Sequence, residues 1–425
     1  MSLVAQIVCE FGKLIFQTGI HAPGLRLLMQ AANMGNAQAQ MIVGYAYFNG
    51  KGTAPDDAQA FQWLQKASDQ SNAVAQRALG IMYANGRGVA RDRTRAAKWF
   101  RSAAEQGDSL AQIQLGRMYL AGDGVPKDFE QAFYWLSKRS HQGNADVQSM
   151  LGWMYQYGNG VGKDPAEASR WYRRAAAQGQ VDAMLNMGTT YELTDESSRD
   201  YVAALKWYRR AAEKGNAIAQ YNLGRLSEHG LGMEKDPVEA VRWYRASAEQ
   251  GNPAAQLYLA NMLKQGLGAP KDQNATIQWL RKSAEGGLAT AQYNLAVMLH
   301  TGSGIPRDLA EAALWYERAE KQGLSLASAN LGTLYKDGLG VRQDYARAIA
   351  SFRQSSEGGH ALGHYYLGQM YDRGLGVECD QVEAITWYRR AAQGGLDLAY
   401  ARLNALGVTT DESAVPTVWT AQLKS

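Results

Sequence analysis

Cysteine is scarce in this sequence. Cys9 and Cys379 are the two present in 425 residues, and they lie near opposite ends of the chain. A bridge between them is not expected, so the sequence fits a reducing compartment. No run of about 18 apolar residues occurs, which argues against a membrane-spanning helix. The formal net charge of +4 is too small to indicate a nucleic acid or a membrane as the partner.

The first 20 residues also lack the features of an export signal. They have no basic start, and Glu10 and Lys13 interrupt the apolar stretch. Cys9 follows Val8 too early in the chain for a lipoprotein cleavage site. We therefore expect a soluble, cytoplasmic protein.

Residue patterns typical of catalysis are missing as well. Of the six histidines, His360 and His364 have metal-like spacing, four residues apart, but no third ligand and no zincin glutamate lie nearby. No serine, cysteine or histidine stands in a recognisable nucleophile motif. The sequence thus predicts no enzyme, no metal site and no cofactor.

Tryptophan, in contrast, recurs at a fixed interval of 36 residues, which indicates a repeat architecture. At the one skipped step, Ser351 stands where the tryptophan is due and Phe352 follows. The tryptophans are Trp63, Trp99, Trp135, Trp171, Trp207, Trp243, Trp279, Trp315 and Trp387. Ten units without insertion or deletion follow from this period: 36–71, 72–107, 108–143, 144–179, 180–215, 216–251, 252–287, 288–323, 324–359 and 360–395.

Each unit predicts two helices. The first, helix A, carries small and apolar residues at helical spacing and a glycine, such as Gly80, that suggests close approach of another backbone. A G-x-G turn follows, whose glycines supply positive φ rather than a phosphate loop. Helix B then carries the tryptophan, which we expect to be core, and ends at a glycine in nine units, with Ser71 as the exception.

An aspartate precedes helix B in all ten units, from Asp56 to Asp380. Ten acids in register suggest either cation binding or helix capping. Because each stands immediately before an apolar helical pattern, and four have a glutamate three residues later, we favour capping boxes.

The two ends depart from the repeat. Residues 1–35 predict an irregular pair of helices that caps the array, with a wettable face turned outward. Residues 396–425 predict one capping helix, Leu396 to about Leu406, followed by a tail without periodicity in which Trp419 stands alone.

The repeat resembles the Sel1-like repeat, a relative of the tetratricopeptide repeat. The string A-x-A-Q-x-x-L-G-x-M-Y-x-x-G-x-G-V-x-x-D, then A-x-x-W-x-x-x-A-A-x-x-G, is matched nearly throughout by 72–107 and 144–179. The resemblance implies an all-α, right-handed α-solenoid with helix A on its inner face, and a bacterial adaptor or scaffold that recognises other proteins. The paired cysteines of the family's disulfide-bonded branch are absent.

Mapping by this resemblance places the third, sixth, tenth, thirteenth and fourteenth positions of each unit in the concave groove. Aromatic and arginine side chains, which are enriched at binding hot spots, gather there, and Trp153 stands off the structural tryptophan ladder. The predicted protein-binding residues are Tyr45, Phe48, Arg77, Arg117, Trp153, Tyr157, Tyr221, Arg225, Glu228, His229, Tyr293, His300, Tyr365 and Arg373, with Asp372 beside them.

Three alternatives remain open. The chain could neutralise a toxin by tight one-to-one binding, as immunity proteins do. Alternatively, basic pairs on helix B, such as Arg209 and Arg210, could bind nucleic acid, although a solvated outer face with arginine stems on apolar neighbours is the simpler interpretation. Finally, Thr194 and Glu196 replace the turn glycines of the fifth unit, which indicates either a partner contact or neutral drift.

Overall fold

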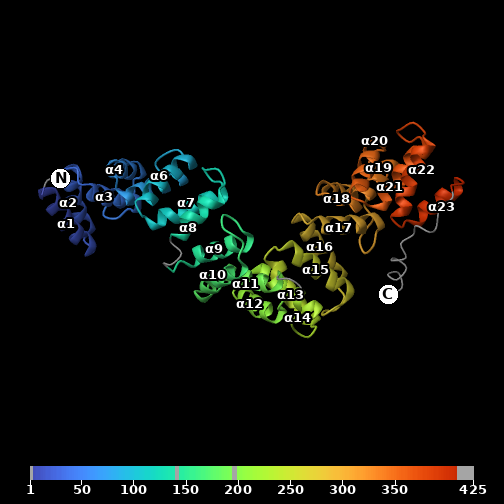
Figure 1. The fold of residues 1–425 in the computed structure, drawn as a ribbon, viewed down its shortest axis with the longest axis horizontal. Coiled ribbons are helices and arrows are strands. Elements are labelled where there is room, and N and C mark those ends of the chain that lie inside the picture. Colours follow the sequence, from blue (N-terminus) through green and yellow to red (C-terminus); the bar gives the residue numbers. More distant parts are fainter. Residues whose placement is uncertain (1–2, 139–142, 194–198, 409–425) are drawn as a thin grey trace. The chain divides into compact units, whose positions relative to one another are not determined.

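The computed structural model describes residues 3–138, 143–193 and 199–408. Within these ranges the chain forms 23 α-helices and no strand (Figure 1). It divides into two compact parts, which we call unit 1 (residues 1–199) and unit 2 (residues 200–425). The 36-residue units of the sequence are called repeats from here on. The turn change at Thr194 and Glu196, and the tail with Trp419, lie outside the described residues.

The helices have nearly uniform length, as a strict 36-residue period requires. Unit 1 contains α1 (Leu3–Gln17), α2 (His21–Asn33), α3 (Ala37–Asn49), α4 (Asp57–Asp69), α5 (Ala73–Asn85), α6 (Arg93–Glu105), α7 (Ser109–Ala121), α8 (Phe129–Ser137), α9 (Ala145–Tyr157), α10 (Pro165–Ala177) and α11 (Val181–Leu193). Unit 2 contains α12 (Tyr201–Glu213), α13 (Ala217–His229), α14 (Pro237–Glu249), α15 (Pro253–Gln265), α16 (Gln273–Glu285), α17 (Ala289–Thr301), α18 (Leu309–Lys321), α19 (Ser325–Asp337), α20 (Tyr345–Glu357), α21 (Ala361–Arg373), α22 (Gln381–Gln393) and α23 (Asp397–Ala405).

From α3 onward, odd-numbered helices are the predicted helix A and even-numbered helices are helix B. Within each unit, successive helices pack against one another and build a stack of helical hairpins. The all-helical repeat fold predicted from the sequence is confirmed.

The repeated aspartate caps helix B in all ten repeats, as predicted. In α6, for example, the Asp92 carboxylate accepts from the backbone N–H of Arg95. The Asp92 backbone N–H itself donates to the Tyr83 carbonyl near the end of α5, at 2.9 Å. The aspartate thus starts helix B and ties it to helix A. The Asp236 backbone N–H is occupied in the same way by the Ser227 carbonyl, at 2.9 Å. The second half of the expected capping box is therefore wrong there: the Glu239 carboxylate instead accepts from Trp243 Nε1, at 3.1 Å.

The turn glycines have positive φ, as predicted. The first glycine of each G-x-G pair ends helix A in the left-handed conformation, as Gly158 does at φ 74°. The glycine that closes helix B does the same, and Ser71, the exception, is the one non-glycine residue with positive φ in the described part of the chain.

Replacing Ser71 with glycine is expected to stabilise the protein. Its φ of 60° is costly for a residue with a Cβ, and glycine removes about 1 kcal/mol of strain while adding some freedom to the unfolded chain. We expect a net gain of about 0.5 kcal/mol, measured by urea unfolding. Ser68→Gly, within α4, is the contrasting variant and should destabilise.

The residue that follows each tryptophan is buried more deeply than the tryptophan itself. The sequence pattern did not predict this. Trp243 is 7% exposed, whereas Tyr244 is fully buried. The same holds along the array, where this position is leucine, phenylalanine or tyrosine. Of the nine tryptophans, Trp63, Trp135, Trp171, Trp243 and Trp315 are buried as expected and the others are half-buried.

The same side chain explains the glycine inside helix A. A Cβ on Gly224 would lie 2.6 Å from the Tyr244 ring, and one on Gly80 would lie 2.8 Å from Phe100. The close neighbour is therefore a side chain of helix B, not the backbone that we expected.

The outer face of α1 differs from the wettable cap that the sequence predicted. Val4, Ile7, Phe11 and Leu14 point outward and are more than half exposed. At the other end, α23 forms where one capping helix was expected. None of the described helices combines the length and apolar character needed to cross a membrane.

Candidate functional site: the inner face of helix A

Several predicted binding residues form a hydrogen bond with a buried tyrosine of their own repeat. Where the residue after the tryptophan is Tyr172, Tyr244, Tyr316 or Tyr388, its hydroxyl lies within hydrogen-bond distance of the thirteenth residue of the same repeat. Tyr244 donates to Glu228 at 2.6 Å, and Tyr388 donates to Asp372 at 3.0 Å. Tyr172 donates to Gln156 at 2.7 Å. Burial, followed by the bond to Glu228, raises the pKa of Tyr244.

His300 is the thirteenth residue of its repeat and lies beside the hydroxyl of Tyr316. The Tyr316 hydroxyl accepts from Asn330 Nδ2 at 3.3 Å and lies 3.3 Å from His300 Nδ1, so it can donate to that nitrogen. Burial, with the nearby Arg307 charge, lowers the pKa of His300 and favours the neutral ring that can accept.

Repeats with an apolar residue after the tryptophan carry no such acceptor. Their pairs of thirteenth residue and post-tryptophan residue are Phe48 with Leu64, Ala84 with Phe100, Leu120 with Leu136, Lys264 with Leu280, and Lys336 with Phe352. The thirteenth position thus follows the chemistry of the core, since a buried hydroxyl requires a partner.

The other predicted residues of unit 2 lie on or near aromatic clusters. The Tyr221 ring lies 5.6 Å from Tyr258 and 6.0 Å from Tyr244. Burial and Tyr258 raise the pKa of Tyr221 to about 12, and Arg225 opposes that rise. Tyr293 packs on Tyr316, and Tyr365 packs on Tyr388. His229 and Arg373 are exposed at the ends of α13 and α21.

At the start of unit 1, the predicted residues are held by their neighbours. The Arg87 guanidinium lies 3.8 Å from the centre of the Phe48 ring, and Tyr45 packs edge-on against that ring. Arg77 Nε lies 3.0 Å from Asp108 Oδ2, within a largely buried ion pair. Burial raises the pKa of Tyr45.

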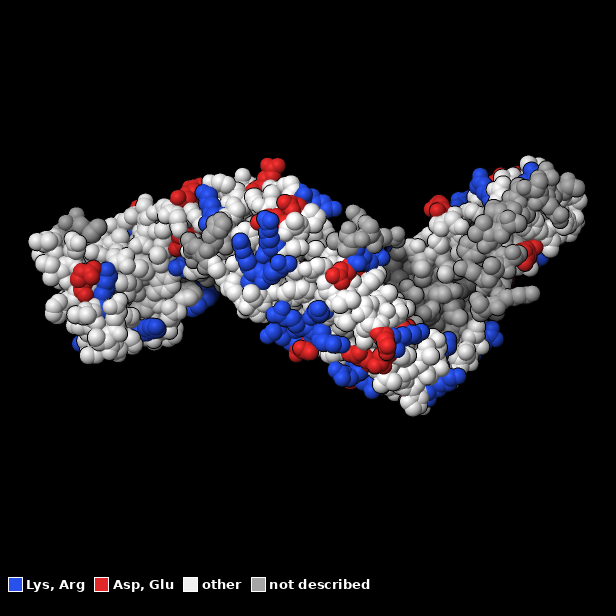
Figure 2. Space-filling view, turned by 60° about the horizontal axis from the view of Figure 1, so that its bottom comes forward, with Lys and Arg blue, Asp and Glu red and all other residues white. Residues whose placement is uncertain are grey.

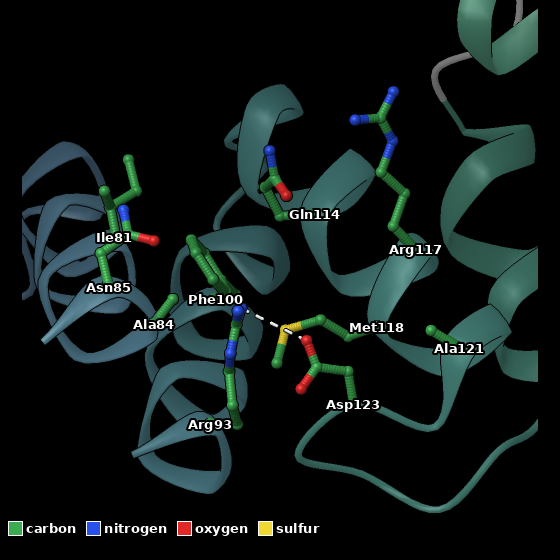
Figure 3. A pocket seen from close by; sticks show the side chains of 10 residues that line it. All are labelled: Ile81, Ala84, Asn85, Arg93, Phe100, Gln114, Arg117, Met118, Ala121 and Asp123. Atoms are coloured by element: carbon green, nitrogen blue, oxygen red, sulfur yellow. Dashed lines mark ion pairs between the residues drawn. The ribbon is translucent and has the colours of Figure 1, made fainter. Parts of the chain in front are cut away.

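Further along unit 1, the inner face is hollowed. A pocket of about 450 Å³ lies between α5 and α7, with the buried Phe100 and Met118 at its centre (Figure 3). Arg93 and Asp123 form an ion pair at 3.2 Å along one side, and Arg117 extends away from that pair. The lining residues are Ile81, Ala84, Asn85, Arg93, Phe100, Gln114, Arg117, Met118, Ala121 and Asp123.

A second pocket, of about 490 Å³, shares Arg117 and continues across α7, α9 and α11. Trp153 lies in it, and the Tyr157 ring, 55% exposed, lies 5.8 Å from the Trp153 ring. Its lining residues are Arg117, Leu120, Asp146, Ser149, Met150, Trp153, Gln180, Asp182 and Asn186. We call the two pockets together the α5–α11 recess. Among the predicted residues, it brings together Arg117 and Trp153, with Tyr157 beside them.

Arg117 stands where the two pockets meet. One of its terminal nitrogens lies 3.3 Å from Asp146 Oδ2, in an exposed pair. Its Nε and that of Arg93 are buried and have no hydrogen-bond partner among the described residues. Buried donors without partners are uncommon in folded proteins, so these two side chains depart from the ordinary pattern of a packed interior.

The seventh position of each repeat was not among the predicted binding positions, but it supplies Gln114, Met150 and Asn186 to the recess. Helical geometry alone points to it, because positions 3, 7, 10 and 14 form one stripe.

One basic side chain of helix B lies over the tryptophan in several repeats. A lysine or arginine three residues after the tryptophan covers the ring, as Arg174 does over Trp171 at 4.8 Å. Arg210, Lys282, Arg318 and Arg390 repeat the arrangement. The expectation of arginine stems on apolar neighbours is confirmed there. On the face in Figure 2, basic clusters lie among acidic side chains and uncharged surface.

His360 and His364, which have metal-like spacing, are partly buried between helices. His364 Nδ1 lies 2.6 Å from Ser356 Oγ, and burial lowers the pKa of both histidines. In the described ranges, no three His, Cys, Asp or Glu side chains gather as metal ligands.

The succession of packed helical hairpins defines a helical-repeat protein of the tetratricopeptide-like class. Within that class the chain belongs to the Sel1 repeat family. The Sel1 repeat matches ten times, at residues 37–72, 73–108, 109–144, 145–180, 181–216, 217–252, 253–288, 289–324, 325–360 and 361–396. Proteins built from these repeats generally mediate protein–protein interactions and are typically non-catalytic scaffolds.

Solved structures agree on the fold. The chain is similar to c5321, a protective antigen of uropathogenic Escherichia coli strains that displays an SLR fold, with 35% identity, coverage of 96% of this chain and 88% of that one, and a TM-score of 0.67. It is also similar to a Sel1 repeat protein from Oxalobacter formigenes, with 31% identity, coverage of 73% and 90%, and a TM-score of 0.61.

A more distant match is the immunity protein Pa5087 from Pseudomonas aeruginosa. It has 22% identity, coverage of 50% of this chain and 81% of that one, and a TM-score of 0.32, which carries no argument about function. No curated protein matches the sequence.

Proposed function

We propose that this protein is a non-catalytic adaptor that binds a segment of another protein in the α5–α11 recess. The observation that carries the proposal is the convergence of Trp153, Arg117 and Met150 on one hollow of the inner face. Tryptophan and arginine at the centre of a concave surface are typical of protein-binding hot spots.

The recess offers contacts of two kinds. Leu120, Met150 and Trp153 form an apolar floor on which a large side chain of the partner can pack. On the polar side, the Arg93 and Arg117 side chains are 35% and 40% exposed, so their guanidinium groups can meet polar atoms of the partner. A segment with an apolar anchor flanked by carbonyl or carboxylate oxygens fits both features.

This proposal leaves the other predicted groove residues in a supporting role. Glu228, His300 and Asp372 are engaged by core tyrosines, and Arg77 is engaged by Asp108. A ligand would have to compete with those bonds. His229 and Arg373, by contrast, are exposed.

Trp153→Ala is expected to weaken partner binding at least 30-fold, the effect of losing about 2 kcal/mol at a hot spot. Trp153 is partly exposed, contacts the Phe129 and Tyr157 rings and packs on the edge of the core rather than inside it, so the melting temperature should fall by only a few degrees. The partner is first captured from the source cell on immobilised protein, and its affinity is then measured by titration calorimetry.

Tyr134→Ala is the matched control. Tyr134 is an exposed aromatic residue of the same unit, on α8 and outside the recess, so its loss should leave affinity unchanged. Equal binding by wild type and the Trp153 variant would refute the recess as the binding site. Capture of nucleic acid that is released by moderate salt and retained by both variants would transfer binding to the basic outer helices.

A further inference from the structure

The first helix has two apolar faces, and the described structure covers one of them. Ala5, Cys9 and Gly12 are buried against α2. On the opposite side, Val4 is 58% exposed, Ile7 58%, Phe11 62% and Leu14 59%. Four large side chains in one row are more than the scattered exposed apolar residues of an ordinary surface.

The equivalent face of every later helix A is covered by a helix. Gly12 corresponds to Gly44 of α3, because each meets a leucine of the following helix, Leu28 and Leu64 respectively. Counting from these glycines, Ile7, Phe11 and Leu14 correspond to Ala39, Val43 and Ala46, which are buried beneath α2. The face of α1 therefore has the position of a surface that receives a helix.

Ile7 and Phe11 are nevertheless larger than the residues that usually stand at their places in the repeats, whereas Leu14 stands where most repeats carry methionine or leucine. The place of Ile7 is alanine in eight of the ten repeats, which lets helix B approach closely. Val4, Ile7, Phe11 and Leu14 are separated by three, four and three residues instead. That is the a and d spacing of a coiled coil, in which two helices pair at a wider distance through interlocking large side chains.

We propose that α1 pairs with α1 of a second copy of this chain, antiparallel and around a twofold axis. An antiparallel pair sets a against d positions, so Val4 packs on Leu14 of the second copy and Ile7 packs on its Phe11. Each layer then combines a smaller and a larger side chain. The seam is self-complementary, as a twofold interface must be.

The charges beside the seam fit this arrangement. Glu10 Oε1 lies 2.7 Å from Lys13 Nζ, so the carboxylates that approach across the axis are each neutralised within their own helix. The same balance argues against a membrane surface as the occupant, because helices that lie on membranes carry an excess of lysine and arginine on their polar face.

The pair is expected to be weak. A contact of about four side chains from each copy is smaller than the roughly 1,200–2,000 Å² of stable interfaces, which indicates dissociation in the micromolar range. Analytical ultracentrifugation of the full chain from 1 to 200 μM tests this. We expect the mass to rise from 46.5 kDa toward twice that value.

Phe11→Glu should hold the chain at 46.5 kDa at every concentration. Val382→Glu, at a 78% exposed position of α22, is the matched control and should still dimerise. An unchanged far-ultraviolet circular dichroism spectrum excludes misfolding of the Phe11 variant. A wild type that remains monomeric at 200 μM would overturn the proposal, as would dimerisation that survives Phe11→Glu.

Cysteine crosslinking tests the direction without relying on a disruptive variant. In a Cys379→Ser background, an Ile7→Cys chain mixed with a Phe11→Cys chain should form a disulfide between the two. Phe11→Cys alone should crosslink far less, because antiparallel pairing offsets the two Phe11 positions. Efficient crosslinking of Phe11→Cys alone would indicate a parallel pair and contradict the proposed geometry.

Discussion

Gly160→Ala is expected to destabilise the protein by about 2 to 4 kcal/mol, although it adds one methyl group at a half-buried turn position. The residue has a φ of 73°, which costs roughly 1–2 kcal/mol for any residue with a Cβ. The new Cβ would also overlap the Phe129 carbonyl oxygen at the start of α8, in the preceding repeat. Because that neighbour is backbone, relief requires the two repeats to separate, and forced contacts of this kind typically cost 1–3 kcal/mol.

Gly158→Ala is the control for the conformational part alone. Gly158 has the same left-handed conformation, with a φ of 74°, but its added Cβ would lie 3.3 Å from the Lys163 Cβ, a tight contact that needs a shift of a few tenths of an ångström rather than an overlap. We expect a loss of about 1 kcal/mol, measured by urea unfolding followed by tryptophan fluorescence. Equal losses at both positions would show that the contact with Phe129 adds nothing.

Tyr244→Ala should cost about 3–5 kcal/mol, the usual range for removing a large aromatic side chain from a core. Tyr244 is fully buried, fills the space above Gly224 and has its hydroxyl bonded to Glu228. The neighbouring Trp243 is slightly more exposed and lies under Arg242. We therefore expect Trp243→Ala to be less damaging in a parallel urea titration.

Tyr244→Phe separates the hydrogen bond from the packing. Losing the hydroxyl leaves Glu228 without its donor and should cost about 1–3 kcal/mol. Adding Glu228→Ala reproduces the pair formed by Phe100 and Ala84 in the second repeat, so much of that loss should be recovered. Strictly additive effects in this double-mutant cycle would refute the coupling.

The sequence was sufficient for the features that repeat and are local. The fixed spacing of Asp92 and its equivalents predicts a helix start, and a cap needs only the few residues that follow it. The same reasoning identifies Ser71 as the exception among the closing glycines, and the structure adds its positive φ. These features depend on backbone conformation, which neighbouring residues largely determine.

Contacts between residues that are far apart in the sequence could not be predicted in the same way. The bond of Tyr244 to Glu228 joins residues 16 apart, and a tetratricopeptide-like mapping placed Glu228 among groove residues instead. The contact of Gly160 with Phe129 crosses two repeats. The recess around Trp153 depends on how three helices pack, which no single repeat specifies. The uncovered face of α1 appears only when its buried side is known.

The tyrosine and acceptor pairs have a consequence for how such a chain can evolve. Both members of the pair lie within one 36-residue block, so a duplication or deletion of a whole block copies or removes them together. Recombination between blocks at the boundary glycines leaves every buried hydroxyl with its partner. Exchange inside a block, between the thirteenth residue and the tryptophan, would instead join a tyrosine to an alanine or lysine. Exchange of whole blocks of 36 residues therefore preserves these bonds, while exchange within a block would break them.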